Sequence, residues 1–150
     1  MIRVIDANIL VALVLPLPYS QAARDHVQAW QKAGVGMAAP SLIYFETNNA
    51  LLRSTRSVLI AGDDLRRCVE DLFLLQLQTF SPTETQTYRA IAWATRLQQS
   101  RIYDAYYVAL AESLEAPFWS ADRRLVNGLR DLGVGWAFHV AEADPFTSAT

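Results

Sequence analysis

The sequence predicts an α/β fold, in which helices cover both faces of a central and mainly parallel sheet. Short apolar runs typical of buried strands alternate with longer amphipathic stretches typical of helices along all 150 residues. The connections between them are short, and no linker, repeat or low-complexity segment interrupts the alternation. With 52% hydrophobic and 19% charged residues, the chain has the composition of a compact globule. We therefore expect residues 1–150 to form a single domain.

The first part of the chain predicts two strands and two helices. Residues 2–6 form an apolar strand, and the apolar positions of residues 8–15 are typical of a helix. The next helix is expected to begin at Ser20, a residue type favoured as an N-cap, and to end before Gly34. A second apolar strand then occupies residues 35–39.

The rest of the chain continues the same alternation. An acidic first turn at residue 63 suits the dipole of a helix, and Pro82 suits the first turn of another. Helices are expected at residues 41–55, 63–75, 82–98, 104–114 and 122–131, and strands at residues 77–80, 117–119 and 134–140.

This order of elements has a consequence for the sheet edge. Parallel strands need right-handed crossovers, which bring the ends of the first and fourth strands to the same edge. Asp6 follows the first of these strands and Asp122 follows the fourth. We therefore expect the two side chains to lie near each other, at the edge where open α/β sheets bind their ligands.

Two acids have unusual local contexts. Asp6 directly follows a buried strand, although it could also cap the helix that comes next. Glu46 shares one face of its helix with Ile43, Ala50 and Arg53, so a carboxylate lies on a mostly apolar stripe. A buried carboxylate needs a partner, which could be a metal ion or a nearby polar side chain such as that of Arg53.

Two further acids open helices. Asp104 and Asp122 both fall in a first helical turn, where a carboxylate is favourable for structural reasons alone. Ser120 is a plausible N-cap for the second of these helices. Each signal is weak alone, but the predicted topology directs all four acids to one edge of the sheet. Carboxylates that converge without basic partners repel each other, and such a group usually holds a cation.

Composition excludes several other classes of protein. A formal charge of −2 gives no bulk attraction to nucleic acid or to anionic membranes, although it permits a local basic patch. Cys68 is the only cysteine, which excludes an internal disulfide and a cysteine-based zinc site. His26 and His139 are interpreted as structural residues, and no glycine-rich phosphate motif is present. No apolar run is long enough to span a bilayer, and we expect a soluble, cytoplasmic protein.

Four segments carry a family resemblance. They are Val4-Ile5-Asp6-Ala7-Asn8, Tyr44-Phe45-Glu46-Thr47-Asn48, Tyr103-Asp104-Ala105-Tyr106-Tyr107-Val108-Ala109-Leu110-Ala111 and Ser120-Ala121-Asp122-Arg123-Arg124-Leu125. In order, spacing and context they resemble the signature segments of PIN-domain nucleases, and most of all the VapC-type toxins of toxin–antitoxin pairs. Trp119 departs from the small aliphatic residue that is more usual before the last segment.

The resemblance implies a three-layer α/β/α PIN-like fold and a ribonuclease that depends on Mg²⁺ or Mn²⁺. By position, Asp6, Glu46, Asp104 and Asp122 correspond to the family's acidic metal-binding and catalytic group, and Ser120 to a supporting residue. The resemblance also implies an RNA substrate, a VapB-type antitoxin partner and a homodimer.

Beyond the acidic group, the residues themselves suggest some further roles. Asn8 is placed to orient a carboxylate or a water. Arginines flank the motif segments and are candidates for contact with RNA phosphates, namely Arg53, Arg56, Arg123 and Arg124. A non-catalytic PIN-like module that binds RNA or protein remains an alternative, as does a metal-dependent phosphatase or DNA nuclease.

Overall fold

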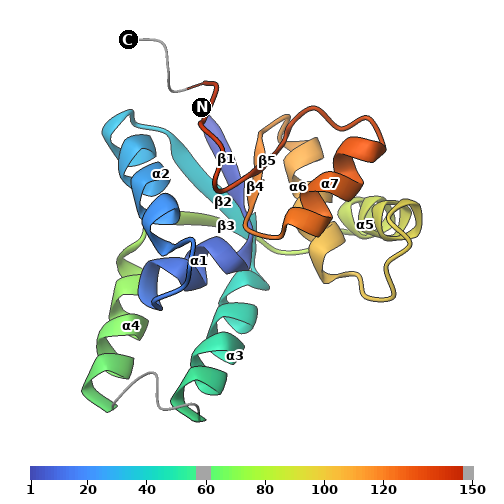
Figure 1. Cartoon of the computed structure of the whole chain (residues 1–150). Coiled ribbons are helices and arrows are strands. Elements are labelled where there is room, and N and C mark those ends of the chain that lie inside the picture. Colours follow the sequence, from blue (N-terminus) through green and yellow to red (C-terminus); the bar gives the residue numbers. More distant parts are fainter. Residues whose placement is uncertain (57–61, 147–150) are drawn as a thin grey trace.

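The computed structural model describes residues 1–56 and 62–146, which form a five-stranded parallel sheet with helices on both sides (Figure 1). The strands are β1 (Ile2–Ile5), β2 (Gly36–Pro40), β3 (Leu77–Phe80), β4 (Phe118–Ser120) and β5 (Ala137–His139). The helices in these ranges are α1 (Ala7–Val14), α2 (Ser20–Lys32), α3 (Ile43–Arg56), α4 (Gly62–Leu74), α5 (Glu84–Arg96), α6 (Tyr103–Ser113) and α7 (Arg123–Asp131). The predicted three-layer α/β/α fold is confirmed.

The sheet has the strand order β3-β2-β1-β4-β5, so β1 lies at its centre. Every pairing is parallel, with Ile2 opposite Gly36 in β2 and Ile5 opposite Trp119 in β4. The carboxyl ends of β1 and β4 are therefore neighbours, as the crossover argument predicts. A parallel sheet buries both of its faces, which explains why β4 is completely buried.

Helices cover the two faces unequally. Figure 1 shows α2 and α4 on one side of the sheet and α5, α6 and α7 on the other, with α1 and α3 below the carboxyl ends of the strands. Helix α6 packs directly on β1, β2 and β4. Its alanines at 105, 109 and 111 are fully buried, and such small side chains let the helix backbone approach the sheet closely. This approach brings the first turn of α6 to the sheet edge.

A buried ion pair connects the last described segment to the centre of the sheet. The Arg3 Nε atom donates to Asp144 Oδ2 over 3.1 Å, and Trp30 Nε1 donates to the same oxygen over 2.7 Å. Arg3 and Asp144 are 1% and 4% exposed. Trp119, the residue that departs from the family pattern, packs between the rings of His26, Trp30 and Phe138. The large side chain at 119 therefore belongs to an aromatic cluster of the core.

For α2, the predicted cap is wrong and the predicted stop is confirmed. Ser20 is the first residue of α2 and does not cap it; Tyr19 holds the N-cap position. The Ser20 hydroxyl instead donates to the carbonyl of Leu15 and accepts from the Leu17 amide, which fixes the turn before the helix. Gly34 adopts a φ of +66° just after α2, a conformation that favours glycine.

Within the described ranges, no helix is long and apolar enough to cross a membrane.

Candidate active site

Asp6 leaves the central strand at the carboxyl edge of the sheet. Its backbone is extended and holds the N-cap position of α1, but its side chain makes no capping hydrogen bond. The Oδ2 atom instead accepts from Ser120 Oγ over 2.6 Å and from Asn8 Nδ2 over 2.9 Å. Asp6 is only 6% exposed. The structure thus favours a site carboxylate over a helix cap at this position.

Ser120 and Asn8 tie the ends of β1 and β4 together around this carboxylate. The Ser120 hydroxyl donates to Asp6 and accepts from Asn8 Nδ2 and from the Asp122 amide, over 3.0 and 2.9 Å. Asn8 Oδ1 accepts from the backbone amide of Ala121 over 2.9 Å. Ser120 and Asn8 each donate and accept hydrogen bonds in one network, and this network holds the Asp6 carboxylate in one orientation.

Asp122 both caps helix α7 and lies at the candidate site. It is the N-cap of α7, where its Oδ1 atom accepts from the Leu125 amide over 3.0 Å. The prediction that Ser120 caps this helix is wrong, because Ser120 belongs to β4 and lies two residues before the N-cap position. Asp122 is exposed, in contrast to the buried Asp6.

Glu46 and Asp104 come from two helices that flank the edge. Glu46 of α3 accepts a hydrogen bond of 2.5 Å from the phenol of Tyr107 in α6. Asp104 accepts from Gln99 Nε2 over 3.2 Å, and Gln99 lies in the loop before α6. Both carboxylates are partly buried. Each acid therefore has a neutral donor that fixes its orientation without neutralising its charge.

The electrostatics of the four acids show that they interact. Burial, together with the charges of Asp104 and Glu46, raises the pKa of Asp6 to about 7, although the Ser120 hydrogen bond opposes this rise. Burial and the charge of Asp104 raise the pKa of Glu46, against the hydrogen bond from Tyr107. Burial and the charge of Asp122 raise the pKa of Asp104. Mutual repulsion of this kind is relieved by a cation.

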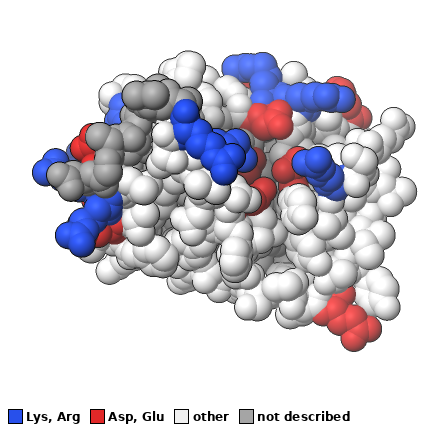
Figure 2. Space-filling view, turned by 90° about the horizontal axis from the view of Figure 1, so that it is seen from below, with Lys and Arg blue, Asp and Glu red and all other residues white. Residues whose placement is uncertain are grey.

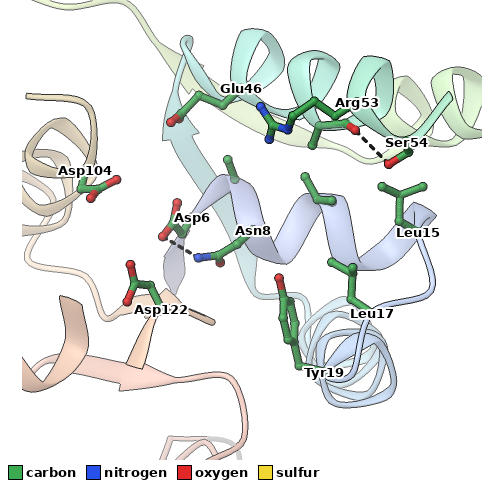
Figure 3. A pocket seen from close by; sticks show the side chains of 13 residues that line it. Asp6, Asn8, Leu15, Leu17, Tyr19, Glu46, Arg53, Ser54, Asp104 and Asp122 are labelled. Atoms are coloured by element: carbon green, nitrogen blue, oxygen red, sulfur yellow. Dashed lines mark hydrogen bonds between the residues drawn. The ribbon is translucent and has the colours of Figure 1, made fainter. Parts of the chain in front are cut away.

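The four acids line one cleft of about 460 Å³. Figure 3 shows their side chains entering the same space from different elements of the fold. Seen from below, the face of the molecule carries acidic side chains gathered in a hollow, with basic side chains nearby (Figure 2). The far part of the cleft, along α1, is more apolar and is lined by Val11, Leu15, Leu17 and Tyr19.

The donor set fits a hard divalent cation, because such cations prefer carboxylate oxygens and Mg²⁺ retains several waters. Within residues 1–56 and 62–146, no three carboxylate or imidazole side chains are close enough to form a complete ligand set by themselves. The shared cleft and the coupled charges still suit Mg²⁺, because this ion needs only one or two direct carboxylates and completes its coordination with waters.

The arginines predicted to contact RNA do not lie together. Arg53 lines the acidic cleft, whereas Arg123 and Arg124 line a second hollow that shares Asp104 and Asp122 with it. Arg56 is exposed at the end of α3, roughly 15 Å along the helix from Glu46 at 1.5 Å per residue. The linings formed by described residues do not include Arg56 in either hollow.

Sequence reasoning missed the donors to Glu46 and Asp104. Tyr107 lies three residues after Asp104, so one face of α6 carries both, and this spacing was a usable signal. Gln99 lies in a loop, where no periodic pattern points to the site. Tyr19 also lines the cleft, and burial followed by the charge of Asp6 raises its pKa.

The chain also resembles known proteins in sequence. Residues 3–128 match the PIN domain family. The chain is 31% identical over 129 residues to Ribonuclease VapC3 from Pyrobaculum aerophilum, covering 83% of this chain and 92% of that protein.

Two solved structures share the fold. PAE2754 from Pyrobaculum aerophilum has a TM-score of 0.65 at 20% identity, covering 93% of this chain and 92% of that one. VapBC2 from Rickettsia felis, bound to a DNA fragment from its promoter, has a TM-score of 0.66 at 15% identity, covering 93% and 98%.

Proposed function

The chain belongs to the PIN-domain family, and from this premise we propose that it is a divalent-metal-dependent endoribonuclease, the toxin of a type II toxin–antitoxin pair. One observation carries the proposal: four acidic side chains from four parts of the fold line one cleft, and the most buried of them, Asp6, lies at its centre. The similarity to a VapC ribonuclease over most of both chains supports the same activity. We further infer that residues 1–150 act as one domain.

We assign the metal to Asp6, Asp104 and Asp122, with Glu46 either as a further ligand or as the group that positions the attacking water. A bound Mg²⁺ or Mn²⁺ would lower the pKa of a water and offset the charge that develops on the phosphate. Ser120 and Asn8 hold Oδ2 of Asp6 and so fix the orientation of this carboxylate in the cleft. Tyr107 fixes Glu46 in the same way.

Tyr107 also holds a proton at a defined atom beside Glu46. The phenol of Tyr107 is fully buried, and its pKa is raised far above the ordinary value by burial first and by the neighbouring carboxylates. It therefore remains a donor to Glu46 at every physiological pH. A carboxylate that keeps one oxygen occupied by this donor has the other available to accept a proton from water.

A partner antitoxin and a homodimer complete the proposal. The structural neighbours include VapBC2 and a toxin–antitoxin complex from Klebsiella pneumoniae, with TM-scores of 0.66 and 0.60. We propose an antitoxin that covers the acidic cleft with a basic side chain. For a second copy of the chain, exposed aromatic residues close to the site offer an apolar contact, among them Phe45 and Tyr103 at 73% and 55% exposure.

The alternative is a non-catalytic PIN-like module that binds RNA or a protein. The same four acids argue against it, because carboxylates that repel each other lower stability and are not needed to bind an anion. The discriminating experiment is purified protein with RNA and Mg²⁺ or Mn²⁺, beside chelator and the Asp6→Asn variant. Cleavage that stops in both controls supports the nuclease. Cleavage that survives chelator or Asp6→Asn refutes it, and binding without cleavage supports the module.

A further inference from the structure

A second hollow, of about 870 Å³, adjoins the acidic cleft and has no role in the chemistry described above. It lies between the loop before α6 and helix α7, which lines it from its first residue to its last. Asp104 and Asp122 line both hollows, so the two meet at the acids. We call this second hollow the arginine groove, because Arg101, Arg123 and Arg124 line it.

The charge of the arginine groove depends on the acids that it shares with the cleft. Three arginines and three aspartates line it, the third aspartate being Asp131. Three positive and three negative side chains give no net charge at neutral pH. A divalent cation held by the shared aspartates would leave two positive charges, and the groove would then attract a polyanion. Arg101 and Arg124 are exposed and accessible for such contacts.

Arg123 differs from the other two because His139 holds it. Its Nη2 atom lies 3.2 Å from His139 Nδ1, and the backbone amide of Ala141 donates to the same nitrogen over 3.1 Å. An arginine and an amide can only donate, so Nδ1 is an acceptor. The other ring nitrogen, Nε2, lies 3.2 Å from the carbonyl of Ala121 and is therefore the protonated one.

This arrangement fixes a buried imidazole as a support for an exposed cation. His139 is 8% exposed and lies opposite Ser120 in the pairing of β4 with β5. The same end of β4 thus positions Asp6 through Ser120 and, through its neighbour β5, positions Arg123. A guanidinium held by a rigid partner loses less conformational entropy on binding than one that moves freely.

We propose that the arginine groove holds the single-stranded RNA that continues from the cleavage site, with Arg101, Arg123 and Arg124 on its phosphates and His139 as a positioning residue for Arg123. The inference rests on the proposed nuclease function. Asp6 is recessed, so only a strand that can bend into the cleft reaches it, which favours an unpaired segment. Guanidinium groups suit phosphates because they donate in a planar, bidentate manner.

The first test measures binding, so that it does not depend on cleavage. The full-length Glu46→Gln protein, which keeps the three assigned metal ligands, is titrated against a labelled single-stranded RNA of roughly a dozen nucleotides, in Mg²⁺, between about 50 and 200 mM NaCl. Arg101→Gln and Arg124→Gln should each weaken binding about three- to tenfold and reduce the salt slope by about 0.7. Arg24→Gln is the matched control, because Arg24 is exposed on α2 and lines a different hollow.

The proposed path would be overturned if Arg101→Gln and Arg124→Gln bind RNA within about twofold of the Arg24→Gln control and show an unchanged salt slope. Equal affinity for a polyglutamate peptide of the same length would also overturn it, because the groove would then be a site for acidic peptides. If the protein binds no RNA at all, the proposed role of the groove is refuted as well. Failure of the wild-type protein to cleave RNA, while the groove variants still lose affinity, refutes the nuclease alone.

The second test concerns His139. His139→Phe should weaken RNA binding by the same factor as Arg123→Gln, and the double variant should be no weaker than Arg123→Gln alone. His139→Asn places an amide oxygen near the position of Nδ1 and should restore affinity to within about twofold. Losses that add in the double variant would show that His139 acts only on the fold. If His139→Phe does not fold, the same cycle with His139→Gln decides.

Discussion

Removing the charge of Asp6 should stabilise the metal-free protein while abolishing its activity. Burial raises the pKa of Asp6 from 3.8 to about 7. Each tenfold change in proton affinity is worth about 1.4 kcal/mol, so the ionised carboxylate costs the folded state up to about 4 kcal/mol. Asn keeps an oxygen that accepts from Ser120 and Asn8 and carries no charge. We expect Asp6→Asn to gain about 2 to 4 kcal/mol in free energy of unfolding at pH 8.

The pH dependence of this gain has a definite sign. Between pH 3.8 and about 7 the folded protein holds a proton on Asp6 that the unfolded chain has lost. The stability of the wild-type protein therefore falls as pH rises through this window, and the full loss is present above about pH 7. The advantage of Asp6→Asn should vanish near pH 4 and be largest at pH 8.

The assay is thermal unfolding of both proteins in chelator, from about pH 4 to 8. The expected gain corresponds to roughly 5 to 15 °C in Tm at pH 8 for a domain of this size. Asp25→Asn, on an exposed part of α2, is the control and should change Tm little. Adding Mg²⁺ should raise the Tm of the wild type far more than that of Asp6→Asn. A variant no more stable than the wild type at pH 8, or a gain independent of pH, would refute the reasoning.

Three further substitutions test individual contacts. Tyr107→Phe removes the donor to Glu46 and should lower kcat about tenfold. It should also shift the acidic limb of the pH–rate profile to higher pH, because this hydrogen bond lowers the pKa of Glu46. An unchanged pH–rate profile would contradict this role. Asp122→Ser keeps an N-cap for α7 and should leave the stability within about 0.5 kcal/mol but abolish cleavage, whereas retained cleavage would restrict Asp122 to capping. Asp144→Ala leaves the buried guanidinium of Arg3 without its partner and should cost about 3 to 5 kcal/mol in urea unfolding, and a loss below about 1 kcal/mol would show that solvent reaches Arg3.

Sequence patterns alone predicted the fold and the four acids that line the cleft. Short apolar runs indicate the strands of a parallel sheet, because strands buried on both faces are apolar throughout. The stretches between these runs have apolar residues at helical spacing and indicate the helices. The rule of right-handed crossovers then predicted that the ends of β1 and β4 lie together. The direct parallel pairing of β1 with β4 confirms this prediction. Local signals sufficed here because the spacing of apolar residues reports which faces of a helix or strand are buried.

Helix ends were less predictable from these signals. Ser20 and Ser120 have side chains that suit an N-cap, yet Tyr19 and Asp122 occupy the N-cap positions. In both cases the serine hydroxyl has a stronger set of partners across a turn or between strands. Capping energies are about 1 kcal/mol, so a buried network with several hydrogen bonds outweighs them.

Only the tertiary structure decided how the acids are supported and charged. The donors Tyr107 to Glu46 and Gln99 to Asp104, and the His139 contact with Arg123, join elements that are distant in sequence or lie in loops. The pKa of Asp6 depends on the burial that the whole fold creates and on charges brought to it through space. Residue types and spacing determine which groups reach the sheet edge, but desolvation and orientation follow from three-dimensional packing, which no local pattern contains.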